Sequence, residues 1–438
     1  MNAVAVIGGG PAGIMAAITA AAEGAQAVVF DRAAPLATIL RTGGGRCNLS
    51  NAAADLGQLV SCYPRGGRFL LSVFSRFGVP ETLGWFRSRG LPLAVEEQDR
   101  VFPASGKAED VRDLLLGEAR RHKVRLRGGT AVRQVERTSD GFRLITGGSA
   151  GRSSSPARFA ALVLATGGDW RNPTGSGYRL AASLGHTITP LAPSLAGLLT
   201  AESWPRGLSG LTLRGVRARA LFEGRKQAEE RGDLLFTHRG ISGPLAFRIS
   251  SRCAPLAFSP QAPLRVSLSL LPDLTPAQAE EELKGAMGSH PRQAIATALG
   301  GYAPRSLCLA VLVLAGIDPT RSCSQISKTE RRAIAELLCG LPLSVTGREE
   351  ETAMVCAGGI ALGEVTPSTM ESRIVPGLFF GGEVLDIDGF TGGFNLQAAW
   401  STGWLAGLGS SRVARGLGSS RAARGLGTAS VVSRTVES

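Results

Sequence analysis

The chain has 438 residues, of which 44% are hydrophobic, and a formal net charge of +13. This length predicts two or three domains with sizeable, mainly aliphatic cores. The seven cysteines are scattered without a C-x-x-C pair, which argues against a zinc site or a disulfide framework, predicts no metal, and favours reduced thiols in the cytoplasm. We expect neither a signal peptide nor a membrane span, because no basic segment precedes the first apolar stretch and the longest apolar run, 307–317, is too short.

The positive charge raises the odds of a polyanionic partner, although an arginine-rich composition without such a partner explains it equally well. Part of this charge lies in residues 409–438, which carry five arginines and one glutamate and repeat with a nine-residue period. This segment has too few apolar side chains to fold alone, so we expect a disordered basic tail. It is either an accessory nucleic-acid arm or a low-complexity expansion without function.

The first predicted strand, 4–7, ends at a glycine turn in which Gly8, Gly10 and Gly13 fit the pattern G-x-G-x-x-G. Gly8 permits the tight turn, Gly10 lets a pyrophosphate approach the backbone, and Gly13 lets the following helix pack on the strand. The N-terminus of that helix favours the phosphates. A second strand ends at Asp31, where an acid would accept a ribose hydroxyl. The pattern predicts a dinucleotide site; the alternative is a glycine-rich turn in an ordinary βαβ unit.

Two further glycine-rich segments would allow a ligand to approach the backbone closely. Three successive glycines, 43–45, precede a cluster of Arg46, Cys47 and Asn48, and such a run is costly to order unless something must approach the chain closely. A mobile surface loop would explain the glycines but not the clustered polar groups. A continuous apolar strand at 158–165, typical of a strand buried on both faces, ends in a second turn at 166–168.

The remaining segments predict an α/β chain with an insertion. Strands are expected at 101–103, 124–127, 131–137, 142–146, 211–222, 233–237, 264–270, 353–357 and 378–380, and helices within 66–90 and at 107–121 and 396–408. Capping boxes begin further helices at Thr275 and Ser327. Because the glycine-turn pattern stops near 190 and returns near 355, we expect two parts of one nucleotide-binding domain, 1–190 and 356–408, an inserted domain, 191–355, and the tail, 409–438.

A single dinucleotide turn leaves NAD or a resident FAD as the cofactor. The segment 381–395 favours FAD, since Glu383 or Asp386 could hold the ribityl chain and the helix after Gly393 could place its positive end near the flavin ring. No second G-x-G-x-x-G follows a strand, so a reduced nicotinamide, NADH or NADPH, would have to visit the flavin directly.

The chain resembles the bacterial family of FAD-dependent oxidoreductases that includes aminoacetone oxidase-type flavoproteins, bile-acid Δ4,6-reductases and ribosomal RNA dihydrouridine synthase. The matching motifs, in family order, lie at 8–13, 43–51, 101–103, 165–168, 236–244 and 358–398. The resemblance implies a Rossmann-like FAD-binding domain of the glutathione-reductase type with an inserted β-barrel and helical domain. One departure is segment 169–178, which is shorter than the usual family turn. The expected cofactor-binding residues are Gly8, Gly10, Pro11, Ala12, Gly13, Asp31, Arg32, Arg41, Gly44, Gly45, Arg46, Asn48, Thr166, Gly167, Gly168, Gly382, Glu383, Gly393, Asn395 and Leu396.

The leading hypothesis is NAD(P)H-dependent reduction of an activated C=C bond, namely the uracil 5,6-bond in large-subunit ribosomal RNA. Hydride delivery to one carbon needs a proton donor at its neighbour. Cys47 is the first candidate, unless it is only a small buried residue beside the cofactor; His238 is the second, although a lone histidine is more often structural. The alternatives are a small-molecule amine oxidase or enone reductase, and a flavin-binding factor without turnover. Oligomeric state is not predicted.

Overall fold

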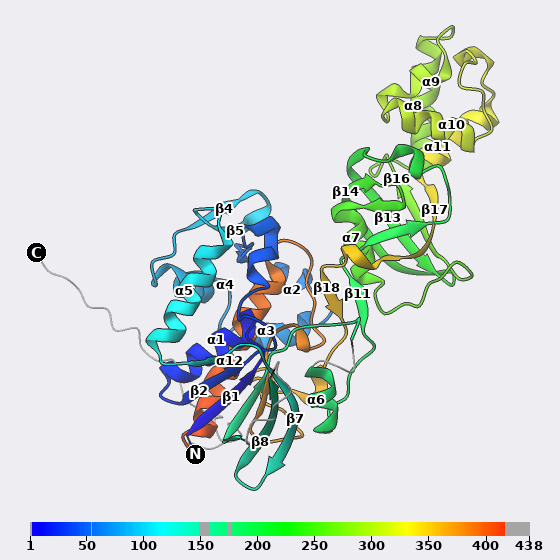
Figure 1. Cartoon of the computed structure of the whole chain (residues 1–438). Coiled ribbons are helices and arrows are strands. Elements are labelled where there is room, and N and C mark those ends of the chain that lie inside the picture. The colour runs from blue at the N-terminus through cyan, green and yellow to red at the C-terminus, as the bar shows by residue number, and fades with distance from the viewer. Residues whose placement is uncertain (1, 54, 149–156, 173–176, 417–438) are drawn as a thin grey trace, which may run out of the picture.

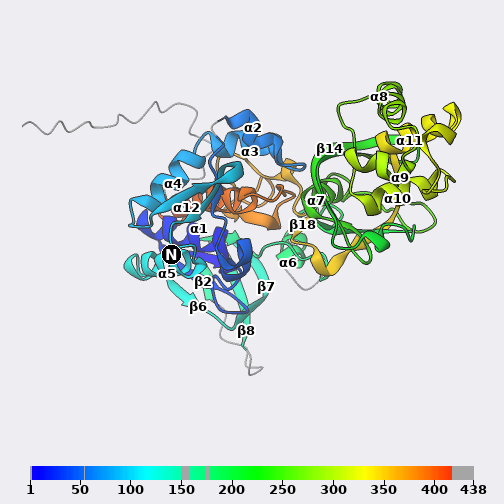
Figure 2. The same cartoon turned by 90° about the horizontal axis from the view of Figure 1, so that it is seen from above.

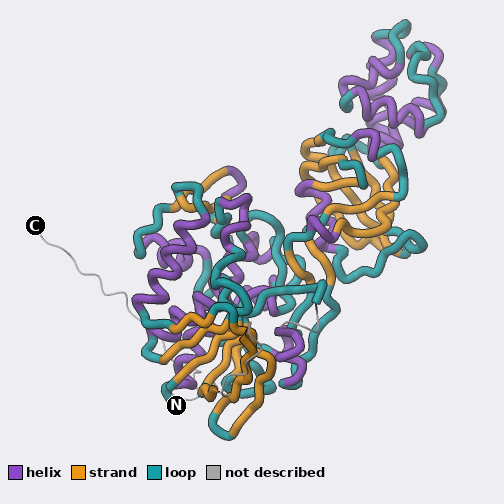
Figure 3. Tube along the Cα trace, viewed as in Figure 1, coloured by secondary structure: helices purple, strands orange, loops and turns teal. Residues whose placement is uncertain are grey.

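A computed structural model describes residues 2–53, 55–148, 157–172 and 177–416. Figure 1 shows two lobes, a sheet flanked by helices and a β-barrel that carries a helical extension at its far end. In Figure 3 the strands of the barrel lie between the first lobe and the helices of this extension. Residues 417–438 of the expected tail and residues 173–176 of the short segment 169–178 lie outside the described residues.

The first lobe is built on a five-stranded parallel sheet in the order β19-β10-β1-β2-β6. Strands β10 and β19 are fully buried and β1 is buried except at Ala3, as their continuous apolar sequences predict, and β19 enters the sheet from beyond the insertion. The mixed α/β architecture expected from the sequence is therefore confirmed. The strands span Ala3–Ile7 (β1), Gln26–Phe30 (β2), Arg125–Arg127 (β6), Ala161–Leu164 (β10) and Leu378–Phe380 (β19).

Helices α1 (Pro11–Ala22) and α12 (Phe394–Ala414) pack closely because glycines face alanines at their contact. A Cβ atom on Gly403 would lie 2.3 Å from the carbonyl oxygen of Ala12, and one on Gly407 would lie 2.4 Å from that of Ala16. The expected end of the last helix at 408 is wrong, since α12 continues to Ala414. Small residues, with Ser410 and Ser411 buried, extend the packed face where composition alone suggested a tail.

Smaller elements complete this lobe. One antiparallel sheet has the order β3-β5-β4 and another the order β7-β8-β9. The remaining elements are α2 (Leu56–Ser61), α3 (Gly67–Phe74), α4 (Val79–Arg87), α5 (Ala108–Arg121), α6 (Gly177–Ser183), β3 (Ser50–Asn51), β4 (Leu93–Glu96), β5 (Arg100–Pro103), β7 (Thr130–Thr138), β8 (Gly141–Gly148), β9 (Ala157–Phe159), and the 3-10 segments η1 (Ile39–Gly45) and η8 (Gly382–Val384).

The chain enters and leaves the second lobe through the antiparallel strands β11 (Ala192–Ser194) and β18 (Val355–Ala357). The closed barrel has the strand order β12-β15-β14-β13-β16-β17. Figure 2 shows α7 and β18 on the side of the barrel that faces the first lobe. The barrel elements are β12 (Gly197–Thr200), β13 (Thr212–Phe222), β14 (Arg225–Phe236), β15 (Gly240–Ser242), β16 (Leu264–Ser269), β17 (Leu341–Glu349) and α7 (Gly243–Arg252).

The helical extension contains α8 (Pro276–Ser289), α9 (Ile295–Ala298), η4 (Leu299–Gly301), α10 (Arg305–Leu314) and α11 (Lys328–Cys339). The capping boxes at Thr275 and Ser327 are confirmed. The strand expected at 233–237 is longer, because β14 begins at Arg225 and its charged residues pair across to β13, as Glu229 does with Arg219. Within the described part of the chain, none of the helices has the length and apolar character needed to span a membrane.

Candidate FAD-binding site

The three glycines of the N-terminal turn have different surroundings. A Cβ atom on Gly8, whose φ is +105°, would lie 2.2 Å from the carbonyl oxygen of Ala165, and one on Gly13 would lie 1.9 Å from that of Gly8. These two glycines are therefore required for packing. Gly10, which precedes Pro11 and Ala12 of α1, has no other heavy atom within 4 Å of such a Cβ. The open space at Gly10 is where the backbone can receive a phosphate.

Asp31 organises the same turn from the end of β2. Its Oδ2 atom accepts a hydrogen bond of 2.5 Å from the backbone nitrogen of Gly9, and its Oδ1 atom accepts one of 2.7 Å from Ala33. The carboxylate thus fixes the glycine turn in addition to any contact with a ribose. Arg32 next to it is exposed and lies 4.0 Å from Asp169.

The loop of three successive glycines, 43–45, here called the glycine loop, has an unusual backbone conformation. Gly43, Gly44 and Gly45 have φ values of +57°, +67° and +85°, a left-handed run that favours glycine at each position. A Cβ atom on Gly44 would meet no other atom within 4 Å. Arg41, at the start of this loop, is exposed. Arg46, at its end, forms an ion pair with Glu96 and stacks over the ring of Phe102 at 4.2 Å, so it is held by β4 and β5.

Cys47 is fully buried, with a φ of +58°, and its backbone nitrogen donates to the carbonyl oxygen of Thr42 at 3.0 Å. Burial raises the pKa of its thiol to about 12. The side chain is consequently a neutral thiol within the hydrophobic core of the first lobe.

Two of the expected cofactor ligands, Asn48 and Asn395, hold protein backbone. With its amide oriented to satisfy its neighbours, Asn48 donates to the carbonyl oxygen of Ser50 and accepts from the nitrogen of Gly393, each at 3.1 Å. Asn395 makes two 2.8 Å hydrogen bonds to the backbone of Gly389. Asn48 thus joins the end of the glycine loop to the N-terminus of α12, whereas Asn395 holds the segment just before that helix. Gly393 at this N-terminus has a φ of +96° and is followed closely by half-buried Leu396.

The turn after β10, residues 166–168, lines the other side of the candidate site and is here called the flavin-binding wall. Gly167 has a φ of +74° and open space at its Cβ position, whereas a Cβ on Gly168 would lie 2.4 Å from that of Cys356. Glu383, which follows Gly382 in η8, accepts a 2.6 Å hydrogen bond from the nitrogen of Cys356. Burial raises the pKa of Glu383 to about 7, and the charge of Asp388 contributes to the rise. Hydroxyl groups of a ligand that donate hydrogen bonds would stabilise the charged form of a carboxyl group in such surroundings.

Several buried polar atoms around this wall have no hydrogen-bond partner among the described residues: Thr166 Oγ1, Trp170 Nε1, Asp386 Oδ1 and Asp388 Oδ1. Unsatisfied buried polar atoms are rare in proteins and point to a missing polar ligand. Together with the open positions at Gly10, Gly44 and Gly167, they fit a long polar cofactor such as FAD, extended from the Asp31 end of β2 to the N-terminus of α12.

Comparison with known proteins identifies the family of this chain. The family model described as "HI0933-like protein Rossmann domain" matches residues 2–409. The chain belongs to this family. This HI0933-like protein is 34% identical over 417 residues to a 3-dehydro-bile acid delta(4,6)-reductase of Clostridium scindens, covering 93% of the chain and 98% of the relative. It is 31% identical over 405 residues to a ribosomal RNA dihydrouridine synthase of Escherichia coli, covering 91% and 95%.

Among solved structures, the open conformation of a flavocytochrome c3 fumarate reductase matches with a TM-score of 0.50 and 15% identity, covering 94% of this chain and 78% of that chain. This likeness shows the fold alone. Family membership, the named relatives and the geometry of the site make the HI0933-like protein an FAD-dependent oxidoreductase.

Sequence reasoning missed a buried ionic centre beside the site. Asp388 is fully buried, forms an ion pair with Arg65, and accepts hydrogen bonds from Ser194 at 2.8 Å and Ser251 at 3.1 Å. Arg65 also donates to the carbonyl oxygen of Ser251 at 2.9 Å. These contacts join the segment before α12 to β11 and α7, and therefore link the two lobes. No local sequence pattern could name the partners of Asp388.

The two candidate proton donors lie in different lobes. His238 is exposed in the turn between β14 and β15, and no hydrogen bond or ion pair joins it to Cys47 among the described residues. Its neighbour Arg239 pairs with Glu349 at 3.3 Å, and Arg171 donates to the carbonyl oxygen of Glu350 at 2.6 Å. The turn that carries His238 thus lies beside the segment that follows Gly168.

Proposed function

We propose that this HI0933-like protein uses NADH or NADPH to reduce FAD and adds hydrogen across a C=C bond conjugated to a carbonyl group. Our preferred substrate is uracil in large-subunit ribosomal RNA, which would become dihydrouridine. The names of the two curated relatives support the reaction class, since a delta(4,6)-reductase and a dihydrouridine synthase both add hydrogen to a C=C bond. Its seven free cysteines are in keeping with a reducing compartment, the cytoplasm.

The observation that carries the RNA substrate is an exposed cationic run on the first lobe. The end of α5 and the edge strand β6 present Arg120, Arg121, Lys123, Arg125 and Arg127, all exposed. Among the described residues, Arg121 pairs with Glu118 at 3.4 Å, and the other four of these cations form no ion pair. A surface with so much uncompensated positive charge suits a phosphate backbone. A small-molecule reductase does not require it.

Different residues of the chain would bind the cofactor and donate the proton. Bound FAD would take two electrons from the nicotinamide and supply them to the substrate as hydride. The turns at Gly10, Gly44 and Gly167 would hold its phosphates and ring by backbone contacts, and Glu383 would accept from its hydroxyl groups. We propose His238 as the first proton donor to test, because it is exposed and its turn lies beside the flavin-binding wall.

Cys47 is the second proposed donor. Its thiol keeps its proton at neutral pH because burial raises its pKa to about 12, but it is fully buried. On this geometry, Cys47 reaches a substrate only if the residues around it move. A conservative Cys47→Ser variant should therefore affect FAD retention more than proton transfer.

The proposed function is tested by the dihydrouridine content of ribosomal RNA, measured by mass spectrometry in cells with and without the gene. We expect one dihydrouridine to disappear on deletion and to return with the wild-type gene. His238→Ala should restore little of it while retaining FAD. An unchanged dihydrouridine content on deletion would overturn the RNA substrate.

A second candidate is an enone reductase acting on a steroid-like molecule, favoured by the 34% identity to the bile-acid enzyme along nearly the whole chain. It predicts that purified protein oxidises NADH or NADPH on addition of a conjugated steroid dienone without RNA. Turnover with the dienone, together with unchanged ribosomal RNA, would favour this candidate over the first.

A further inference from the structure

Helix α7 of the second lobe lies at the junction with the first lobe, as Figure 2 shows. Its Phe247 packs against the hydrophobic core of the first lobe, whereas Arg248 and Arg252 are exposed. Because residues four positions apart lie on the same face of a helix, the two guanidinium groups are neighbours. They form a pair of cations at the edge of the junction, here called the α7 arginine pair.

The α7 arginine pair covers the segment that leads into the N-terminus of α12. The Cζ atoms of Arg248 and Arg252 each lie 5.2 Å from the centre of the Phe390 ring, which is itself buried. The carbonyl oxygen of Phe390 accepts from Asn395 of α12 at 3.5 Å. Cys62 of the first lobe is also close, since the charges of both arginines oppose the rise in its pKa that burial causes. The pair therefore lies beside the end of the candidate FAD-binding site that faces the second lobe.

A single acid serves both arginines. Glu230 of β14 accepts a hydrogen bond of 2.9 Å from Nε of Arg252, and its Oε2 atom lies 3.7 Å from Nη1 of Arg248. Asp388, another acid at this junction, is already paired with Arg65. Among the described residues, neither Arg248 nor the two Nη groups of Arg252 donate a hydrogen bond. The pair thus carries one uncompensated positive charge, and most of its N–H donors are open to a ligand.

The open donors suit a phosphate group, which a planar guanidinium binds through two parallel hydrogen bonds. RNA carries a phosphate at every nucleotide, so a uracil held at the flavin brings a phosphate to the edge of the site. Reduction of a steroid dienone needs no such group. The exposed position of both arginines also suits a chain that continues away from the flavin.

We infer that the α7 arginine pair binds a backbone phosphate of RNA next to the uracil that is reduced. The inference rests on the proposed function and names the part of the second lobe that holds this substrate. It gives the barrel lobe its own contact with the RNA, in addition to the cationic run at the end of α5.

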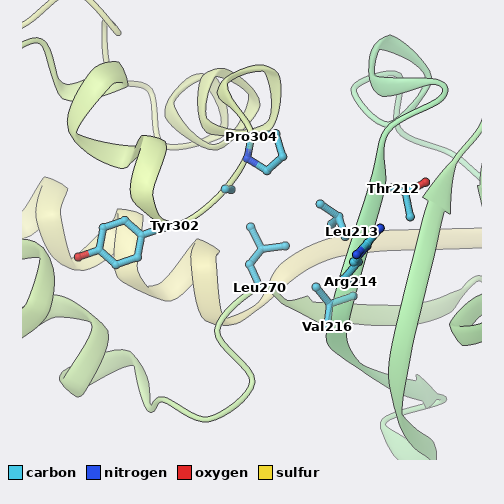
Figure 4. A pocket seen from close by; sticks show the side chains of 8 residues that line it. Thr212, Leu213, Arg214, Val216, Leu270, Tyr302 and Pro304 are labelled. Atoms are coloured by element: carbon cyan, nitrogen blue, oxygen red, sulfur yellow. The ribbon is translucent and has the colours of Figure 1, made fainter.

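A matched control comes from the side of the barrel that meets the helical extension. A cavity of about 200 Å³ lies there between β13 and the segment 302–304, and Figure 4 shows Arg214 among its lining side chains. Arg214 is the only cation among the described residues that line this cavity, which is smaller than the roughly 300–1,000 Å³ of sites for drug-sized ligands. Arg214 and Arg305, at the start of α10, are exposed and form no hydrogen bond or ion pair among the described residues. Replacing both changes the net charge equally and leaves the α7 arginine pair in place.

The test uses full-length protein with bound FAD and a fluorescein-labelled single-stranded RNA oligonucleotide rich in uridine, followed by fluorescence anisotropy. R248Q with R252Q should weaken binding at least about tenfold, because charge-assisted hydrogen bonds to a phosphate are lost. The slope of log affinity against log salt should fall by about 0.7, the value for one phosphate of a single strand. The control, R214Q with R305Q, should bind within about twofold of the wild type, because salt screens charges that do not touch the RNA.

Glu230 supplies a readout of opposite sign. Glu230→Gln removes the acid that both arginines share and should strengthen RNA binding about threefold, since a negative charge close to the phosphate is lost. If the R248Q/R252Q variant does not retain FAD, Glu230→Gln decides the question. Unchanged or weaker RNA binding by Glu230→Gln would then overturn the inference.

Anaerobic stopped-flow reduction of the flavin by NADPH distinguishes a phosphate of the RNA from a phosphate of the reductant. The R248Q/R252Q variant should reach its half-maximal rate at the same NADPH concentration as the wild type. A variant that needs at least about tenfold more NADPH but binds RNA like the wild type would assign the pair to the reductant and overturn the inference.

RNA affinity and dihydrouridine content together separate this inference from the proposed function. Equal RNA affinity of the R248Q/R252Q variant and the control overturns the inference, and so does wild-type protein that does not bind the oligonucleotide. In either case the proposed function stands if the wild-type gene restores dihydrouridine to the deletion strain. If the R248Q/R252Q variant loses RNA affinity but the wild-type gene restores no dihydrouridine, the phosphate site stands and the proposed function fails.

Discussion

The carboxylate of Glu364 lies 3.0 Å from the Nδ1 atom of His186, a buried ring whose Nε2 atom lies 2.9 Å from the hydroxyl of Ser372. That hydroxyl accepts hydrogen bonds from the backbone nitrogens of Ile374 and Val375, so its own hydrogen is free to point to Nε2. The ring proton therefore resides on Nδ1 and is donated to Glu364. The ring also packs edge-on against Phe380 of β19 at 4.7 Å, so the arrangement supports the strand that leads to Glu383.

This arrangement predicts loss of stability on mild acidification. Burial lowers the pKa of His186 below 6.5, although Glu364 opposes the shift. The folded state thus disfavours the charged ring, and its contribution is complete above pH 6.5 and is lost as the pH falls through the lowered pKa. The urea concentration at the midpoint of unfolding, followed from pH 8 to pH 5.5, measures this loss of stability. His186→Gln should flatten the dependence and lower stability at pH 8 by about 1–2 kcal/mol; an unchanged dependence would contradict the assignment.

Glu383 predicts the opposite pH dependence in protein freed of FAD. Because burial raises its pKa from 4.5 to about 7, the folded state favours the protonated acid, and this contribution is present below pH 4.5 and lost as the pH rises through 7. Glu383→Gln should therefore raise the free energy of unfolding at pH 8 by about 1–3 kcal/mol. It should also weaken FAD binding, since an amide replaces one acceptor oxygen by a donor. Urea unfolding tests the first effect and a fluorescence titration with FAD tests the second. A free energy of unfolding at pH 8 that is lower in Glu383→Gln than in the wild type would refute the first.

Substitutions in the first glycine turn should distinguish effects on FAD binding from effects on folding. Gly10→Ala should leave the stability of the FAD-free protein within about 1 kcal/mol, because the backbone is not left-handed there and the space is open. It should reduce FAD affinity at least about tenfold by blocking the approach of the phosphates. Gly13→Ala serves as the contrast: its Cβ would overlap the carbonyl oxygen of Gly8, so folding itself should suffer. Thermal unfolding and FAD titration distinguish the two, and wild-type FAD affinity in Gly10→Ala would place the phosphates elsewhere.

The Arg65–Asp388 pair predicts strong coupling between the lobes. Asp388→Ala leaves the largely buried guanidinium of Arg65 without its counter-charge and should destabilise the protein by about 3–5 kcal/mol. The double variant Arg65→Met with Asp388→Ala should recover part of this loss, because no buried charge then remains unpaired. A double-mutant cycle of urea unfolding energies measures the coupling; additive effects would show that the pair does not stabilise the junction.

Much of the fold could be read from neighbours along the chain. The G-x-G-x-x-G turn, the buried strand before Gly167, and the capped helices at Thr275 and Ser327 depend on residues within a few positions of one another, so their local patterns suffice. The length of β14 could not be read in this way. Its charged residues satisfy one another across the ladder, as Glu229 and Arg219 do, and that pairing is invisible in a single segment.

In the candidate site, too, some features follow from local sequence and others only from tertiary contacts. The sequence by itself predicted a dinucleotide turn lined by glycines, because the missing Cβ atom and the freedom to adopt a positive φ belong to glycine itself. Only the tertiary structure decided that Asn48 holds Gly393 and that Asp388 faces Arg65. Arg65 and Asp388 are 323 positions apart, and their contact depends on how the lobes pack around the entry strands β11 and β18. Such pairings arise from the burial of charge between elements that the chain order keeps far apart.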